Sequence, residues 1–273
     1  MSSAITIQGA RGTIPECGKS FLKYGGNTTC YSMITEKSVI IIDAGTGISR
    51  VAAEIAKLPK KLPITLLFTH FHMDHVVGFP CFDPLYDKNA SITIMADPRR
   101  RDNWEHTLQA FMDKPYWPVG LGDTDIKMNL KDIPVSRDAM DVLGTRISWF
   151  KVPHPQQCLA YRIEKNNTTT VIATDVEYSY DNIDPAFINF CQGADFLVFD
   201  AQFTPEEYKK HKGWGHSTWH TGTRIAACAG IGRLILTHHS PKRTDSALNK
   251  ILREAKNEFS RTYIAHEGMK LQK

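Results

Sequence analysis

The chain has 273 residues, and its 33 Lys and Arg residues against 29 Asp and Glu residues give a net charge of +4. Apolar residues make up 42% and charged residues 23% of the chain, which excludes disordered, collagen-like and coiled-coil proteins. The weak positive charge suits an anionic substrate but lies far below that of a dedicated nucleic-acid-binding protein.

Short apolar or β-branched runs bounded by Gly, Asp or Pro predict strands throughout the chain. In chain order these runs are Ile5–Gln8, Thr29–Ile34, Val39–Ile42, Ile64–Phe68, Ser91–Met95, Arg146–Val152, Cys158–Ile163, Thr169–Ala173, Phe196–Phe199 and Leu234–Leu236. Helical patterns cover Gly47–Leu58, Ser217–Gly230 with Ser217 in capping position, and a C-terminal helix from Leu248 to Phe259 capped by Thr244 or Asp245. The order differs from a regular β-α alternation, so it predicts two mixed sheets with helices outside.

No linker or low-complexity segment divides the chain, and we therefore expect a single domain over residues 1–273. The least regular stretch is residues 97–124, which contains Arg99-Arg100-Arg101 and a Pro- and aromatic-rich segment. We expect this stretch to be an excursion from the core.

The N-terminal segment lacks the features of a signal peptide, and no apolar run reaches the ~18 residues of a membrane-spanning helix. The six cysteines show no C-x-x-C spacing and are expected to be reduced thiols. These features predict a cytoplasmic protein without membrane association.

The predicted strand Ile64–Phe68 runs directly into Thr69-His70-Phe71-His72-Met73-Asp74-His75. A loop at the end of a strand can turn several imidazoles and a carboxylate toward one point, as a metal site requires. Four candidate ligands within six residues exceed what one tetrahedral ion can use comfortably, so the motif predicts a two-metal site.

Further candidate ligands follow other predicted strands in the same way. They are His154, Asp175, Asp200 and His238. Histidine and carboxylate ligands without cysteine suit divalent zinc, with manganese or iron as alternatives.

With these residues the sequence resembles the metallo-β-lactamase fold hydrolases, whose H-x-H-x-D-H motif is matched by residues 70–75. The resemblance implies a four-layer αββα sandwich with a two-metal site at one edge of its sheets. It implies that one ion is held by His70, His72 and His154 and the other by Asp74, His75 and His238, with Asp175 bridging both. Asp43 matches the family's aspartate that orients ligands without binding metal.

Other segments resemble the phosphodiesterase branch of this family. They are Gly9–Pro15, Tyr24–Thr28, Gly78–Pro80, and Asp200–Thr204 followed by Gly213–Thr218. A His-Ser-Thr element downstream of a carboxylate is characteristic of ribonuclease Z, class II cyclic-nucleotide phosphodiesterases and small bacterial cyclic-(di)nucleotide phosphodiesterases.

The chemistry expected of this site is phosphodiester hydrolysis. Two divalent cations about 3.5–4 Å apart would lower the pKa of a bridging water, and the resulting hydroxide would attack phosphorus in line. His216 is placed to protonate the leaving group, with Asp200 orienting its ring, and Asp74 completes the predicted catalytic set. Arg11 and Asn27 are candidate contacts to the substrate phosphate, with roles in turns as the alternative.

A small substrate is favoured because only one hairpin fits between His154 and Asp175, where bacterial ribonuclease Z relatives carry a tRNA-gripping arm. We therefore expect a small anionic phosphodiester, such as a cyclic nucleotide or cyclic dinucleotide, and no dedicated nucleic-acid surface. The alternatives are an ester, thioester or lactam hydrolase, a ribonuclease Z-like endoribonuclease, and a non-catalytic nucleotide sensor. The oligomeric state stays open, although relatives in the family often form homodimers.

Overall fold

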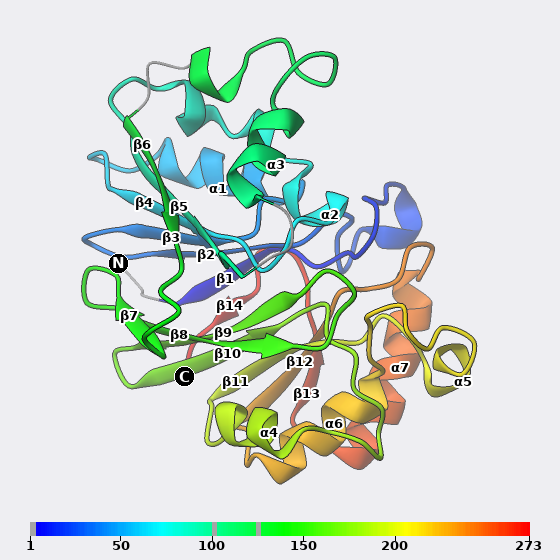
Figure 1. The fold of residues 1–273 in the computed structure, drawn as a ribbon. Helices are drawn as coiled ribbons and strands as arrows, with labels where there is room; N and C mark the ends of the chain where they lie inside the picture. Colours follow the sequence, from blue (N-terminus) through cyan, green and yellow to red (C-terminus); the bar gives the residue numbers. More distant parts are fainter. Residues whose placement is uncertain (1–3, 100–102, 124–126) are drawn as a thin grey trace.

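The computed structural model describes residues 4–99, 103–123 and 127–273. Within these residues the strands form two seven-stranded mixed sheets stacked on each other (Figure 1). The first sheet has the order β14-β1-β2-β3-β4-β5-β6 and comprises Lys270–Leu271, Ile5–Gly9, Cys30–Ile34, Val39–Ile42, Ile64–Leu67, Ser91–Ala96 and Lys127–Asp132. The second has the order β13-β12-β11-β10-β9-β8-β7 and comprises Thr262–Ile264, Arg233–Thr237, Phe196–Asp200, Thr168–Ala173, Cys158–Lys165, Arg146–Val152 and Ala139–Asp141.

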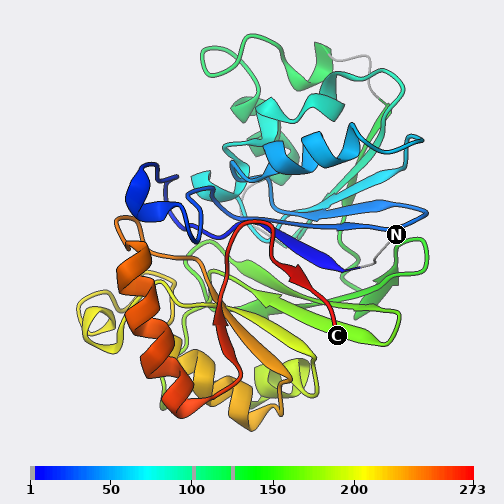
Figure 2. The same ribbon diagram turned by 180° about the vertical axis from the view of Figure 1, so that it is seen from behind.

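Helices cover the outer faces of both sheets. Helices α1 (Ile48–Ile55) and α3 (Trp104–Phe111) lie on the first sheet, and α4 (Pro185–Cys191), α6 (Trp219–Cys228) and α7 (Asp245–Glu258) lie on the second (Figures 1 and 2). The short helices α2 (Met73–Val76) and α5 (Pro205–Tyr208) belong to loops at one edge. This arrangement confirms the expected four-layer αββα sandwich.

Successive side chains along a strand point to opposite faces of its sheet, one toward the other sheet and the next toward the covering helices. In β3, Ile40 and Ile42 pack between the two sheets, whereas Val39 and Ile41 pack on the side of α1. Because both faces of this strand are buried, it is apolar at every position.

Parallel pairing brings the carboxyl ends of several strands to one edge. Strands β3, β4 and β5 pair in parallel in the first sheet, and β10, β11 and β12 do so in the second. Strand β8 runs antiparallel to β9, which is antiparallel to β10, so β8 ends at this edge too. Helices α2 and α5 lie toward this edge, and the start of β1 and the C-terminus lie at the opposite one (Figures 1 and 2).

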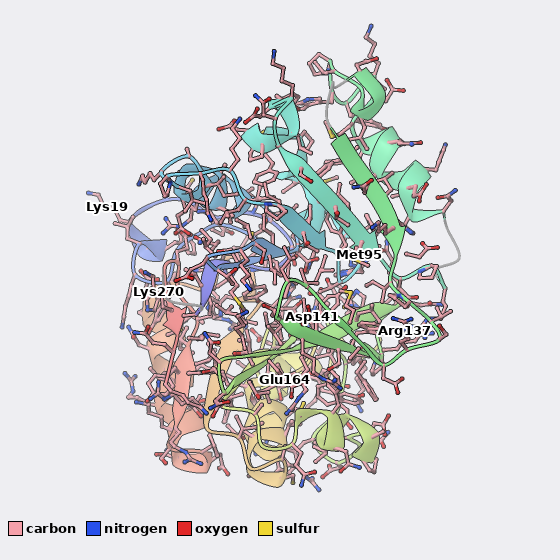
Figure 3. The ribbon with its side chains drawn as sticks, turned by 90° about the vertical axis from the view of Figure 1, so that its left-hand side faces the viewer. Lys19, Met95, Arg137, Asp141, Glu164 and Lys270 are labelled. Atoms are coloured by element: carbon pink, nitrogen blue, oxygen red, sulfur yellow. The ribbon has the colours of Figure 1, made fainter. Side chains whose placement is uncertain are left out.

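That opposite edge faces the viewer in Figure 3, where Asp141 of β7 and Glu164 of β9 are labelled. Strand β7 is one of four strands that the sequence analysis did not predict, together with β6, β13 and β14. Three of the four are two or three residues long, and β6 has only two apolar residues among six, so none matches the strongly apolar runs from which strands were predicted.

Two further details differ from expectation. The N-cap of α6 is Thr218, whose side chain accepts a hydrogen bond from Thr221 N–H, and not Ser217. The Ser217 hydroxyl donates instead to the carbonyl of Val176 at 2.6 Å. Within residues 97–124, α3 places Trp104 and Leu108 in the core beside the first sheet, and residues 100–102 and 124 lie outside the described residues.

Among the residues that the structure describes, no helix combines the length and apolar character needed to cross a bilayer.

Candidate metal centre

The predicted ligands converge at the edge where the strands end. Residues 70–75 follow β4, and the other candidates follow β8, β10, β11 and β12 in the second sheet. Three groups result, in each of which one atom per side chain lies within 4.8 Å of the others. The groups are His70, His72, His154 and Asp175; Asp74, His75, Asp175 and His238; and Asp175, Asp200, His216 and His238.

The first group, here called the imidazole cluster (His70, His72, His154 and Asp175), is held mostly by histidines. His154 Nε2 lies 3.1 Å from His72 Nδ1, and His70 Nε2 lies 3.7 Å from Asp175 Oδ1. Burial lowers the pKa of His70 well below its usual range and lowers that of His72 to about 4. These imidazoles are therefore neutral at pH 7, which is the form that binds metal.

The second group, here called the carboxylate cluster (Asp74, His75, Asp175 and His238), has two acidic side chains. His238 Nε2 lies 3.0 Å from Asp74 Oδ2 and 3.2 Å from Asp175 Oδ2. Burial alone would lower the pKa of His238, but Asp175 and the hydrogen bond with Asp74 outweigh it and raise that pKa to about 9. The two carboxylates thus favour a positive charge at this position.

The atoms that face inward suit metal binding. Nδ1 of His70 lies 3.1 Å from Thr69 Oγ1, Nδ1 of His75 lies 2.8 Å from Asp43 Oδ2, and Nδ1 of His154 lies 2.9 Å from the Gly215 carbonyl. Such contacts on Nδ1 fix the orientation of each ring and leave Nε2 free to bind a metal ion. Nε2 of His70 is buried and forms no hydrogen bond, and the donor set of histidine and aspartate is one that divalent metals accept.

Asp43 occupies the place expected of a residue that orients ligands. Its carboxylate accepts hydrogen bonds from the backbone N–H and the hydroxyl of Thr69, both at 2.8 Å, in addition to its contact with His75. The sequence analysis did not single out Thr69, although it directly precedes the histidine motif.

The backbone at three strand ends adopts the left-handed region. The φ angles of Asp43, Asp175 and His238 are +60°, +53° and +57°. Non-glycine residues with this conformation cost about 1–3 kcal/mol each and cluster at functional sites. In this chain they follow β3, β10 and β12, and all three turn into the site.

His216 and Asp200 form a pair beside the two clusters. His216 Nδ1 lies 2.8 Å from Asp200 Oδ2 and 3.8 Å from Asp175 Oδ1. Asp200 also accepts the backbone N–H of Asp175 at 2.9 Å. Asp200 therefore contacts both the His216 ring and the segment that carries Asp175.

Several residues that the sequence analysis missed support the site. Thr13 N–H donates to Asp74 Oδ2 at 2.8 Å, and a Cβ on Gly12 would lie 2.3 Å from the His238 ring. The close packing of Gly12 against His238 explains why the N-terminal Gly-Ala-Arg-Gly segment has no side chain at this position. Gly215, which contacts His154, belongs to a segment noted only for its resemblance.

Of the two roles predicted for Arg11, the structure supports the one in turns. Arg11 is fully buried, and its guanidinium donates to the carbonyls of Gly25 at 2.9 Å and Arg243 at 2.7 Å. It therefore joins three loop segments, as the alternative role in turns anticipated. The carbonyl of Asn27 accepts the N–H groups of Ala10 and Arg11, both at 3.0 Å, so its backbone stabilises the same turn, and a substrate contact by its side chain stays a prediction.

The remaining histidines lie outside the three groups. His220 stacks on Tyr180 with ring centroids 4.0 Å apart, and His239 Nε2 lies 2.9 Å from the carbonyl of Ala265. His211 stacks on Phe203 with ring centroids 4.7 Å apart. These contacts are those of packing residues.

The sandwich and its edge of histidines and aspartates define a class of hydrolases. The family described as "Beta-lactamase superfamily domain" matches residues 39–239, which is more than half of the chain. The chain therefore belongs to the beta-lactamase superfamily.

Individual proteins show the same relationship. The chain is 23% identical to ribonuclease Z of Lactococcus lactis subsp. lactis over 293 residues, covering 86% of this chain and 90% of the relative. The metallo-β-lactamase fold protein YhfI of Bacillus subtilis matches with a TM-score of 0.73 at 22% identity, covering 98% of both chains. A diphosphatase of the PhnP family matches with a TM-score of 0.71 at 18% identity, covering 99% of this chain and 97% of that one. The curated relative confirms the resemblance to ribonuclease Z, and the two solved structures confirm the fold.

Proposed function

We propose that this protein is a two-metal hydrolase of phosphodiesters whose substrate is a small cyclic nucleotide or cyclic dinucleotide. The observation that carries the proposal is the pair of ligand clusters sharing Asp175, with His216 and Asp200 beside them. A relative named ribonuclease Z and a neighbour described as a diphosphatase support a substrate containing phosphorus.

The imidazole cluster would hold one ion and the carboxylate cluster the other. Zinc is the first candidate for both, with manganese and iron as alternatives, because the donors are imidazoles and carboxylates. When bound, two such ions supply an activated water and neutralise charge on the phosphate oxygens.

His216 would act as the acid that protonates the leaving oxygen. Its Nδ1 is held 2.8 Å from Asp200, so that Nε2 of the ring can carry the transferable proton. Asp200 stabilises the protonated ring and fixes its orientation. Asp74 accepts Thr13 N–H and lies 3.0 Å from His238 Nε2, which orders the side of the site opposite the imidazole cluster.

The surroundings of His154 leave room for the rest of a small substrate. A cavity of about 780 Å³ adjoins His154 and is lined in part by Glu177, Tyr178 and Tyr208. Between His154 and Asp175 the chain forms only the β9–β10 hairpin, whose turn residues Asn166 and Asn167 have φ angles of +48° and +57°. A short hairpin provides no arm for gripping tRNA, which favours a small substrate over a ribonuclease Z-like one.

A substrate panel tests the proposal. Metal-loaded protein is assayed with bis(p-nitrophenyl) phosphate, cyclic mononucleotides, cyclic dinucleotides, a tRNA precursor, S-lactoylglutathione and nitrocefin. We expect turnover of the phosphodiesters, with the cyclic nucleotides preferred over the tRNA precursor. Turnover restricted to S-lactoylglutathione or nitrocefin would contradict the proposal, and nucleotide binding without turnover would indicate a sensor.

We further propose that the protein acts in the cytoplasm on a free, anionic phosphodiester, without a dedicated nucleic-acid surface. The net charge of +4 supports a small substrate. A homodimer is the oligomeric state that sedimentation analysis should test first.

A further inference from the structure

The turn formed by residues 213–215 lies against His154. The His154 Nδ1–H donates to the Gly215 carbonyl at 2.9 Å, which leaves Nε2 facing His72. The φ angle of Gly215 is +90°, and a Cβ at this position would lie 2.2 Å from His154 Nδ1. The position of the Gly215 carbonyl therefore sets the orientation of the His154 ring.

Glu177 holds this turn with its carboxylate. Oε2 accepts the N–H of Gly215 at 2.7 Å, and Oε1 accepts the N–H of Gly213 at 2.7 Å and the hydroxyl of Tyr208 at 3.1 Å. Three donors from two neighbouring segments thus converge on one side chain, which bridges both glycines of the turn.

The backbone of Glu177 holds the other side of His154. Its N–H donates to the carbonyl of Pro153, the residue before His154, at 2.8 Å. Ser217 fixes the segment around Glu177 independently, because its hydroxyl donates to the Val176 carbonyl at 2.6 Å and accepts Tyr178 N–H at 3.0 Å. A change confined to the Glu177 carboxylate should therefore release the turn and leave the end of β10 in place.

We propose that Glu177 is a positioning residue that sets the metal affinity of the imidazole cluster by fixing the Gly215 carbonyl on His154. The inference rests on the proposed two-metal site. The effect is geometric, because the N–H groups that Glu177 accepts belong to other peptide units than the one that contains the Gly215 carbonyl. Among the described residues, no hydrogen bond or ion pair joins the carboxylate cluster to residues 213–215, so we expect its affinity to stay unchanged.

The Glu177→Gln variant removes this restraint selectively. A Gln side chain has one acceptor oxygen and one NH2 group, so one of the two glycine N–H groups would face a donor. Glu206→Gln is a matched control, because Glu206 is an exposed acidic residue on the neighbouring helix α5. Glu177→Asp is a second variant that keeps the charge but is too short to bridge Gly213 and Gly215.

The experiment titrates metal-free protein with Zn²⁺ against a competing fluorescent chelator and follows Co²⁺ absorption in parallel. His154→Ala and His238→Ala identify the signal of each site. In Glu177→Gln we expect affinity at the imidazole cluster to fall about tenfold, the lower end of the range for residues that orient ligands, with the carboxylate cluster unchanged. Glu177→Asp should change in the same direction, and Glu206→Gln should match the wild type.

Equal affinities in Glu177→Gln and wild type would overturn the inference and leave the two-metal site intact. Equal weakening of both clusters together with a lower melting temperature of the metal-free protein would assign Glu177 a general structural role and also overturn it. If Glu177→Gln does not fold, Glu177→Asp decides by the same two criteria. Failure of the wild type to bind two ions would contradict the proposed function itself, and the inference with it.

Discussion

The two clusters that share Asp175 differ in how they balance charge. In the imidazole cluster, burial lowers the pKa of His70, His72 and His154, and these rings are neutral without a metal. In the carboxylate cluster, Asp175 and Asp74 raise the pKa of His238 to about 9 despite its burial. Without a metal, the imidazole cluster therefore offers neutral donors, whereas the carboxylate cluster already stabilises a positive charge on a histidine.

The largest effect is expected where the two clusters meet. Asp175→Ala removes the one side chain common to both, so metal content should fall at both clusters and hydrolysis should lose most of the at least ~10⁶-fold acceleration typical of enzymes. Elemental analysis and phosphodiesterase assays on the same preparation measure the two losses together. Loss of only one ion with substantial activity would show that the clusters function separately.

His216→Ala tests the acid that lies outside both clusters. We expect full metal content and a rate about 10²–10⁴-fold lower, because only the transfer of a proton to the leaving group is lost. A substrate with a p-nitrophenolate leaving group needs less protonation and should be affected less. A wild-type rate on cyclic nucleotides would remove His216 from the proposed mechanism.

Asp43→Asn should weaken the carboxylate cluster more than the imidazole cluster, because Asp43 contacts His75 directly and reaches His70 only through Thr69. Asp43 lies 2.8 Å from His75 Nδ1, and loss of such a partner typically lowers metal affinity by about 10–100-fold. The same chelator competition measures it, and Asp195→Asn at the far end of the second sheet serves as control. An equal loss at the imidazole cluster would contradict the distinction between the two.

The smallest effects concern the stability of the metal-free protein, and their signs are opposite. The folded-state pKa of His72 is about 4, below the usual 6.5, so the unfolded state binds more protons and stability falls between pH 6.5 and 5. Because this ring is only partly buried, solvent screening should keep the loss below about 1 kcal/mol. The folded-state pKa of His238 is raised to about 9, so its contribution is present below pH 6.5, and about 2 kcal/mol of it is lost as the pH rises from 7 to 9.

Urea unfolding at pH 5, 7 and 9 measures both dependences. His72→Gln should reduce only the loss of stability in acid, and His238→Gln only the loss in base. A single variant that removes both losses would show that the two clusters titrate as one unit.

The sequence predicted the layers and the placement of the site because both depend on local patterns. Apolar runs such as Val39–Ile42 matched strands to the residue, and polar residues directly after such runs lie at one edge once the strands pair in parallel. The hydrogen-bond partners of Arg11 and Glu177 could not be predicted, because they lie in segments far away in the sequence. Ser217 was mistaken for the cap of α6 for the same reason, since its hydroxyl is engaged by Val176.

The left-handed backbone at Asp43, Asp175 and His238 has a consequence for the evolution of this chain. Glycine would relax each of these positions, yet it offers neither a carboxylate nor an imidazole. Random substitution followed by selection for thermostability alone should therefore enrich glycine at these three sites and produce robust, inactive proteins. If positions 43, 175 and 238 stay Asp, Asp and His in a natural lineage, this would indicate selection for the site itself.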